Sequence, residues 1–252
     1  MNYETYASDL QRRWNQDMNN RPEEWVVSES LSAKITQEGQ MNDFYGATSV
    51  ITLSESDRQK CRVAQEQLLV VLGHQLVKLE PDTFHLTIHS FSNDNNTPGS
   101  IQIIQEKLAQ LEEAIAAEFR SIAALYGGQR IRMRSLGVST SGKDVISIKY
   151  VPASKDDYEI LTDLYNRMEK IFPEYRSYVP HVSLGYFKLK KLEQAEIALL
   201  YDTLERMCKE LDLDIVLDVD RFVYQHHFHM NDFRMFFAFK SISDLGPVRL
   251  LK

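Results

Sequence analysis

Two short segments, one in each half of the chain, place a histidine and a hydroxyl residue two positions apart. FHLTIHSF contains His85 and Thr87, and HVSLGYF contains His181 and Ser183. Side chains alternate along a strand, so each pair shares one face, with apolar residues behind it. Two opposed imidazoles can remove a proton from a nucleophile and deliver one to a leaving oxygen, while hydroxyls hold phosphate oxygens. The pattern predicts acid–base cleavage of a phosphodiester.

The alternative interpretation is two unrelated strand histidines with neighbouring hydroxyls. A single His-x-Ser/Thr motif recurs by chance, because its positions are loosely specified. Two such motifs, one in each half of the chain and each alternating with apolar residues, arise by chance far more rarely and favour a catalytic pair. We therefore predict His85 and His181 as catalytic, and Thr87 and Ser183 as substrate-binding.

The two motifs resemble the paired signatures of the 2H phosphoesterase superfamily, which includes bacterial RNA 2′,3′-cyclic phosphodiesterases. The order of elements over 44–240 also matches. The resemblance implies a bilobal fold with a central cleft and metal-independent hydrolysis, with His85 as acid and His181 as base. A less-characterised bacterial branch is similar in its N-terminal run, which here contains Lys34, Glu38-Gly39, Phe44-Tyr45-Gly46 and Thr48.

Helical and alternating periodicities predict an α+β fold of two antiparallel-sheet lobes with outer helices. The expected helices are 3–18, one capped by Ser54 and Asp57, one that begins near Ile101 and is stopped by Gly127-Gly128, 156–171 and 193–210. The expected strands are 46–53, 84–91, 130–138, 144–151, 181–187, 213–224 and 233–240, with a turn at 139–143. We divide the chain into a helical extension (1–43), a bilobal domain (44–240) and a C-terminal tail (241–252).

Two further residues are predicted to bind substrate because they share a face with the motifs. Simple alternation puts His89 beside His85 and Thr87, either lining the cleft or at its mouth. By the same rule Phe187 follows His181 and Ser183 and could stack on a base, whereas Tyr186 is explained by core packing.

A row of arginines offers another candidate for substrate binding. Arg130, Arg132 and Arg134 alternate with Ile131 and Met133, which leaves the guanidinium groups on one face. They would either bind a phosphate or lie on an exposed edge strand, where charge prevents pairing with another chain. Arg134 lies furthest into the strand and is the predicted ligand, and Lys149 on the next strand is comparable.

The run His226-His227-Phe228-His229 suggests a metal site. No acidic or cysteine partner stands at a familiar spacing, and metal sites usually need three or four ligands. We therefore predict a polar connection between the last two strands, and neither a metal nor another cofactor.

The composition of the chain limits the classes of binding partner that we expect. The net charge of −7 disfavours long duplex nucleic acid, which binds through many cationic contacts, and leaves a small nucleotide or an RNA end. There is no apolar run of about 18 residues and no secretory segment, so we expect no membrane partner and a cytoplasmic monomer. Cys61 and Cys208 are too isolated to predict a disulfide framework.

Three functions remain open. The first is hydrolysis of a cyclic phosphodiester: an RNA 2′,3′-cyclic end, a small cyclic nucleotide, or ADP-ribose 1″,2″-cyclic phosphate. The second is a non-catalytic nucleotide or RNA-end binding module, which the intact histidines and hydroxyls disfavour. The third is a metal-dependent hydrolase built on the C-terminal histidines, which EDTA would inhibit.

Overall fold

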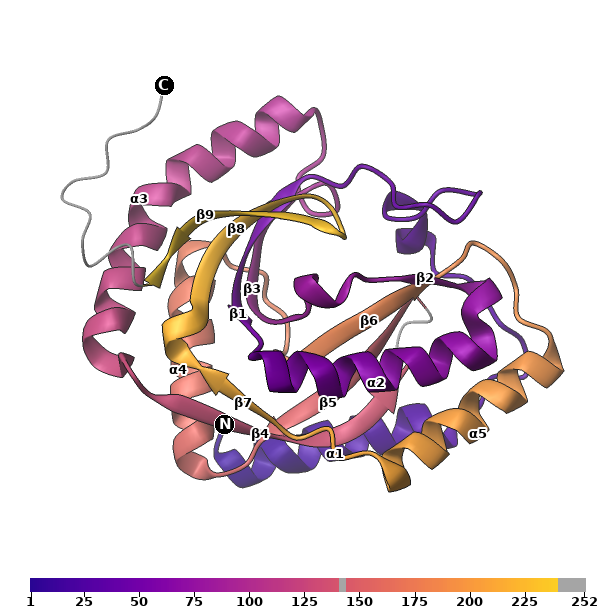
Figure 1. Ribbon diagram of the computed structural model, residues 1–252. Helices are drawn as coiled ribbons and strands as arrows, with labels where there is room; N and C mark the ends of the chain where they lie inside the picture. The colour runs from indigo at the N-terminus through magenta and orange to yellow at the C-terminus, as the bar shows by residue number, and fades with distance from the viewer. Residues whose placement is uncertain (141–143, 240–252) are drawn as a thin grey trace.

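The computed structural model describes residues 1–140 and 144–239, which form two antiparallel sheets with helices outside them (Figure 1). In the order β3-β1-β8-β9, the first sheet consists of β1 (Gly46–Thr52), β3 (His85–Asn93), β8 (Phe222–His229) and β9 (Asp232–Ala238). In the order β2-β6-β5-β4-β7, the second consists of β2 (Leu76–Lys78), β4 (Arg130–Ser139), β5 (Val145–Pro152), β6 (His181–Phe187) and β7 (Ile215–Asp218). The predicted α+β class with two antiparallel-sheet lobes is confirmed.

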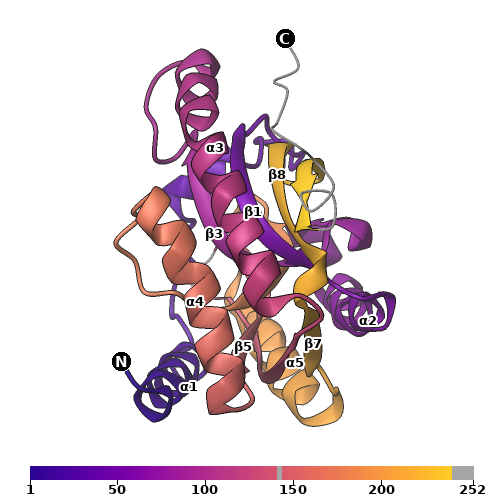
Figure 2. The same cartoon turned by 90° about the vertical axis from the view of Figure 1, so that its left-hand side faces the viewer.

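Helices cover the outside of both sheets. The α-helices are α1 (Tyr3–Asn19), α2 (Glu55–Leu72), α3 (Ile101–Tyr126), α4 (Lys155–Ile171) and α5 (Gln194–Glu210). The short 3₁₀ helices are Glu29–Ala33, Gly73–Gln75, Pro81–Thr83 and Val219–Arg221. Helix α3 lies on the first sheet with α4 beside it (Figure 2), and α4 contacts both sheets. Helices α2 and α5 contact each other and the second sheet. In the described part of the chain, every helix is too short or too polar to cross a membrane.

Serine caps start two of these helices, as the sequence predicts for the first. The N–H of Asp57 donates to Ser54 Oγ at 3.2 Å, and the N–H of Asp157 donates to Ser154 Oγ at 3.2 Å. Each cap satisfies one amide that the first helical turn leaves without a partner, which sets where α2 and α4 begin.

The two motif strands meet where the sheets approach each other. Strand β3 is an edge of the first sheet and contacts β6 of the second. The hydroxyl of Tyr178, just before β6, donates to the backbone carbonyl of Thr87 in β3 at 2.9 Å. The chain thus brings together two strands that begin 96 residues apart, at His85 and His181.

The first 43 residues are integrated into the domain. Trp25 is 1% exposed and its ring centroid lies 4.7 Å from that of Phe187 in β6. Leu31 and Ile35 are fully buried in the main hydrophobic core, and α1 packs on β4 and β5 through Leu10. The segment therefore shares the core of the two lobes.

The C-terminal strands differ from the prediction. The single strand expected at 213–224 is divided: β7 belongs to the second sheet, and after the 3₁₀ turn Val219–Arg221 strand β8 joins the first. The histidine run lies in β8, between β1 and β9, so the predicted polar connection there is wrong. Strand β8 continues into the histidine run because it pairs with β1 there: His227 is the partner of Gly46.

Two predicted features lie outside the described residues: the middle of the 139–143 turn, at 141–143, and the tail 241–252. Cys61 and Cys208 are free thiols.

Candidate active site

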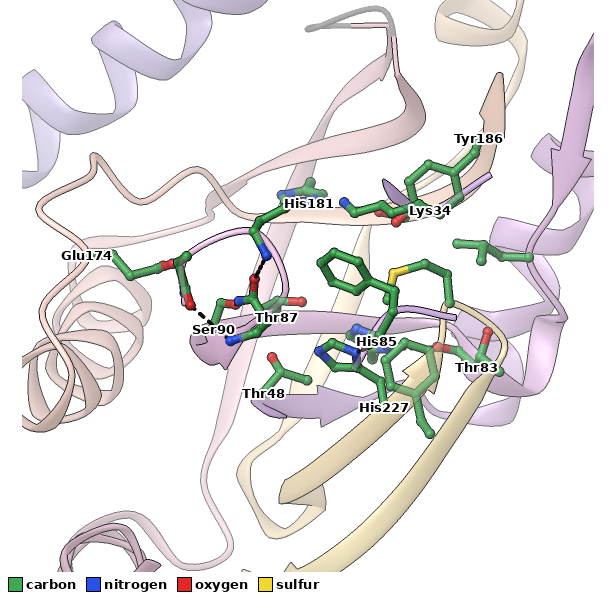
Figure 3. A pocket seen from close by; sticks show the side chains of 18 of the residues that line it. Lys34, Thr48, Thr83, His85, Thr87, Ser90, Glu174, His181, Tyr186 and His227 are labelled. Atoms are coloured by element: carbon green, nitrogen blue, oxygen red, sulfur yellow. Dashed lines mark hydrogen bonds between the residues drawn. The ribbon is translucent and has the colours of Figure 1, made fainter. Parts of the chain in front are cut away.

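A pocket of about 330 Å³ lies between the two sheets and contains both motifs. Figure 3 shows side chains entering it from β1, β3, β6, β8 and the N-terminal segment. Its polar lining residues include Lys34, Thr48, Thr83, His85, Thr87, Ser90, Glu174, Arg176, His181, Ser183, Tyr186 and His227. A volume of this order suits a ligand of about mononucleotide size.

The two motif histidines are held in the same way. His85 Nδ1 lies 2.7 Å from the carbonyl oxygen of Thr83, and His181 Nδ1 lies 2.9 Å from that of Val179. A carbonyl only accepts, so in each neutral ring Nδ1 carries the hydrogen and Nε2 keeps its lone pair. Both rings line the pocket, which leaves each Nε2 available for proton transfer there.

Both motif hydroxyls line the same pocket. Thr87 and Ser183 follow their histidines by two positions on the same strand face. The bond from Tyr178 to the Thr87 carbonyl fixes β3 against the segment that enters β6. The four residues predicted from the motifs therefore converge on one pocket.

Burial makes both imidazoles poor cations. It lowers the pKa of His85 to about 4, and together with the nearby Lys149 ammonium it lowers the pKa of His181 to about 3. Lys149 is the β5 neighbour of His181, and its own pKa falls to about 8 because it is buried. Both rings are therefore neutral near pH 7, and both Nε2 atoms are proton acceptors.

His89 does not lie where alternation predicts. The pairing of β1 with β3 shifts, because Val50 pairs with Thr87 and the adjacent Ser49 pairs with His89. Ile88 is therefore an extra residue, and such a bulge reverses the faces that follow it. His89 points away from the pocket and binds Glu169 Oε2 of α4 through Nε2 at 2.8 Å.

A second bulge corrects the prediction for Phe187. Ser147 of β5 pairs with Ser183 and the adjacent Ile146 pairs with Gly185, so one extra residue of β6 lies between them. Beyond it the faces exchange. Tyr186 lines the pocket, whereas Phe187 is 1% exposed and packs against Trp25.

Arg134 lies outside the pocket. It is exposed and lines a shallow depression beside α1 together with Gln11 and Asn15. The sheet order explains the difference, because β5 separates β4 from β6. Arg130 and Arg132 are exposed as well, but β4 pairs with β5 on one side and with β7 on the other, so the predicted edge strand is wrong.

His227 is a pocket residue that the sequence did not indicate. Its Nδ1 lies 2.8 Å from the Phe44 carbonyl oxygen, its ring stacks on Phe44 at 5.5 Å, and burial lowers its pKa to about 4. Its ring lies against Gly46, where a Cβ would be 2.8 Å from the His227 ring, and a contact between residues so far apart leaves no signal in the sequence.

The C-terminal histidines do not form a metal-ligand set. His227 faces the pocket, whereas the adjacent His226 stacks on Phe236 at 5.1 Å with its Nδ1 3.0 Å from the Tyr45 hydroxyl. Among residues 1–140 and 144–239, no three His, Cys, Asp or Glu side chains are grouped so as to hold a metal ion.

Comparison with known proteins shows the fold. No family model and no curated protein matches the chain. A conserved Agrobacterium tumefaciens protein of unknown function is similar over 85% of this chain and 94% of its own, with 16% identity and a TM-score of 0.65. Similarity to Escherichia coli LigT (10% identity, 77% and 94% coverage) and Kluyveromyces marxianus Usb1 (11%, 77% and 97%) has TM-scores of 0.43 and 0.41. Only the first of these matches is strong enough to show a shared fold.

Proposed function

We propose that this protein is a 2H phosphoesterase that hydrolyses a cyclic phosphodiester: the 2′,3′-cyclic phosphate of an RNA end or a small cyclic nucleotide. One observation carries the proposal. Two histidines from different sheets, tethered through Nδ1 to a carbonyl two residues earlier, line one pocket together with a hydroxyl two residues later. Unrelated strand histidines would not be expected to share this arrangement.

Two imidazoles that line one pocket can carry out an in-line displacement. One imidazole removes a proton from water as its oxygen bonds to phosphorus. The bond to the leaving ribose oxygen breaks, and the other imidazole, which starts protonated, gives that oxygen its proton. Thr87 and Ser183 donate hydrogen bonds to the non-bridging oxygens, where negative charge accumulates. The product is a phosphomonoester, and proton exchange with water restores both rings.

Neighbouring charge favours His181 as the base and His85 as the acid. Two ammonium groups, Lys149 and Lys34, act on His181 and oppose its protonation beyond the effect of burial. Burial alone lowers the pKa of His85. A bound phosphodiester carries a negative charge, which raises the pKa of an adjacent imidazole, so substrate itself would help His85 to hold the proton.

The pocket size and overall charge support a small substrate. About 330 Å³ accommodates one nucleotide unit and not a duplex. The net charge of −7 also disfavours extended phosphate contacts outside the pocket. A non-catalytic module that binds the same ligands is the second candidate, and it differs from the first only in turnover.

The test is hydrolysis of a panel of cyclic phosphodiesters in EDTA by the wild type and by His85→Ala and His181→Ala. We expect turnover by the wild type and losses in kcat of about two to four orders of magnitude in each variant, the usual effect of removing a positioned acid or base. Turnover that requires added zinc, or that survives both substitutions, would refute the mechanism. Binding without turnover would identify the non-catalytic module.

A leaving-group comparison separates the two roles. A p-nitrophenyl phosphodiester releases an anion that needs no proton. Activity of His85→Ala should largely recover on it, and activity of His181→Ala should not. The opposite result would exchange the assigned roles.

A further inference from the structure

Lys34 enters the pocket from outside both sheets. It follows the 3₁₀ helix Glu29–Ala33, and its N–H donates to the Leu31 carbonyl at 2.9 Å. Its own carbonyl accepts from the Asn42 N–H at 2.8 Å, and Ile35 forms a β-bridge with Met41. Because Leu31 and Ile35 are fully buried, the backbone of Lys34 is fixed relative to the core.

Aromatic rings hold the ammonium group without neutralising it. Lys34 Nζ lies 5.5 Å from the ring centroid of Phe44 and 5.2 Å from that of Tyr186. Such cation–π contacts orient a charge and leave its donors free for another ligand. Within the described ranges Lys34 forms no salt bridge, and Figure 3 shows the acidic Glu174 on the other side of the pocket.

The charge acts on the interior of the pocket. Lys34 lowers the pKa of both His181 and His227, which line it. Arg176, the other cation lining the pocket, is exposed to solvent. Because the imidazoles are neutral, the half-buried positive charge in the pocket is that of Lys34. A half-buried cation that forms no ion pair favours binding of an anion.

We propose that Lys34 binds a non-bridging phosphate oxygen of the substrate and stabilises the charge that develops there during hydrolysis. It would be a further catalytic residue, supplied by the N-terminal segment and additional to the paired histidines and hydroxyls. Its catalytic role rests on the proposed function, whereas its binding of a phosphate group does not.

The substitution Lys34→Met tests this, because methionine keeps an unbranched stem beside Phe44 and Tyr186 and removes the charge. Lys34→Arg keeps the charge with a different shape. Lys190→Met is the control, since Lys190 is an exposed lysine outside the pocket. The probes are inorganic phosphate and adenosine 2′-monophosphate for binding, followed by calorimetry, and 2′,3′-cyclic AMP for turnover.

In Lys34→Met we expect affinity for both binding probes to fall at least about tenfold, and kcat/KM to fall by about 10²–10³, the scale for losing one preorganised charge-stabilising group. Lys34→Arg should retain part of the binding, and Lys190→Met should match the wild type. The acid limb of the pH–rate profile should move toward neutral pH in Lys34→Met, because His181 loses a neighbouring cation.

Binding by Lys34→Met within twofold of the wild type would overturn the proposal, as would a wild-type protein that binds neither probe. If the wild type hydrolyses nothing but Lys34→Met still loses phosphate binding, the proposed function fails and the anion-binding role of Lys34 stands. If the wild type hydrolyses the cyclic nucleotide and Lys34→Met does so equally well, the proposed function stands and the role of Lys34 fails.

Discussion

Three neutral imidazoles facing one pocket should make the folded protein sensitive to acid. The pKa values of His85 and His227 are about 4 and that of His181 is about 3, against 6.5 for an unperturbed histidine. The folded state therefore binds fewer protons than the unfolded state below pH 6.5. The free energy of unfolding must then fall as the pH falls through 6.5 toward these lower values.

The size of this effect follows from the shifts. Each imidazole costs between about 1 and 2 kcal/mol of stability from pH 6.5 to 5.0, because the unfolded form becomes almost fully protonated and the folded form does not. Three such groups sum to about 5 kcal/mol, which is comparable to the whole stability of many domains. The contribution of these three imidazoles to stability should be constant above pH 7.5 and fall steeply below pH 6.

Urea denaturation at half-unit steps from pH 7.5 to 5.0 measures this dependence. His227→Gln should reduce the slope of this dependence by about 1 kcal/mol per pH unit between pH 6 and 5, whatever its effect on absolute stability. His74→Gln is the control, since the His74 side chain is 63% exposed. A wild-type free energy that stays constant to pH 5, or a slope that His227→Gln leaves unchanged, would refute neutral burial of these rings.

Three further substitutions address catalysis. Lys149→Met should move the acid limb of the pH profile of kcat/KM toward neutral pH, because the ammonium that opposes protonation of His181 is lost. Lys155→Met, on the exposed face of α4, is the control. An acid limb that stays in place in Lys149→Met would contradict this prediction. Thr87→Ala and Ser183→Ala should each lower kcat/KM by about ten- to a hundredfold, which is less than the effect of removing a histidine, since each removes one phosphate hydrogen bond among several. Steady-state kinetics measures this. A loss equal to that of His181→Ala would assign the hydroxyl a larger role.

The elements that carry the motifs could be predicted because their signals are local. Helical and alternating periodicity placed the helices and most strands within a few residues, since each period reflects which side chains share a face. Ser54 and Asp57 marked the start of α2 for the same reason, as a cap is a contact across three residues. Division of the last predicted strand into β7 and β8 was not visible, because it depends on which sheet each half joins.

The bulges at Ile88 and Leu184 show where alternation fails. Each is a mismatch between two paired strands, so it cannot be read from one of them. His89 and Phe187 follow the extra residue and are turned away from the pocket, and Ser90 and Tyr186 take their places. The motif residues precede the bulges and keep their predicted faces.

The sequence by itself determined the chemistry of the pair: two imidazoles, each with a hydroxyl two residues later and apolar residues behind. These relations span at most a few residues along a strand, so the pleat fixes them. The tertiary structure alone decided that Lys34 and His227 join His181 in one pocket, and that Lys149 lies beside His181. Those positions, and the pKa values they change, arise from segments far apart in the chain, which meet only because the sheets and the N-terminal segment share one core.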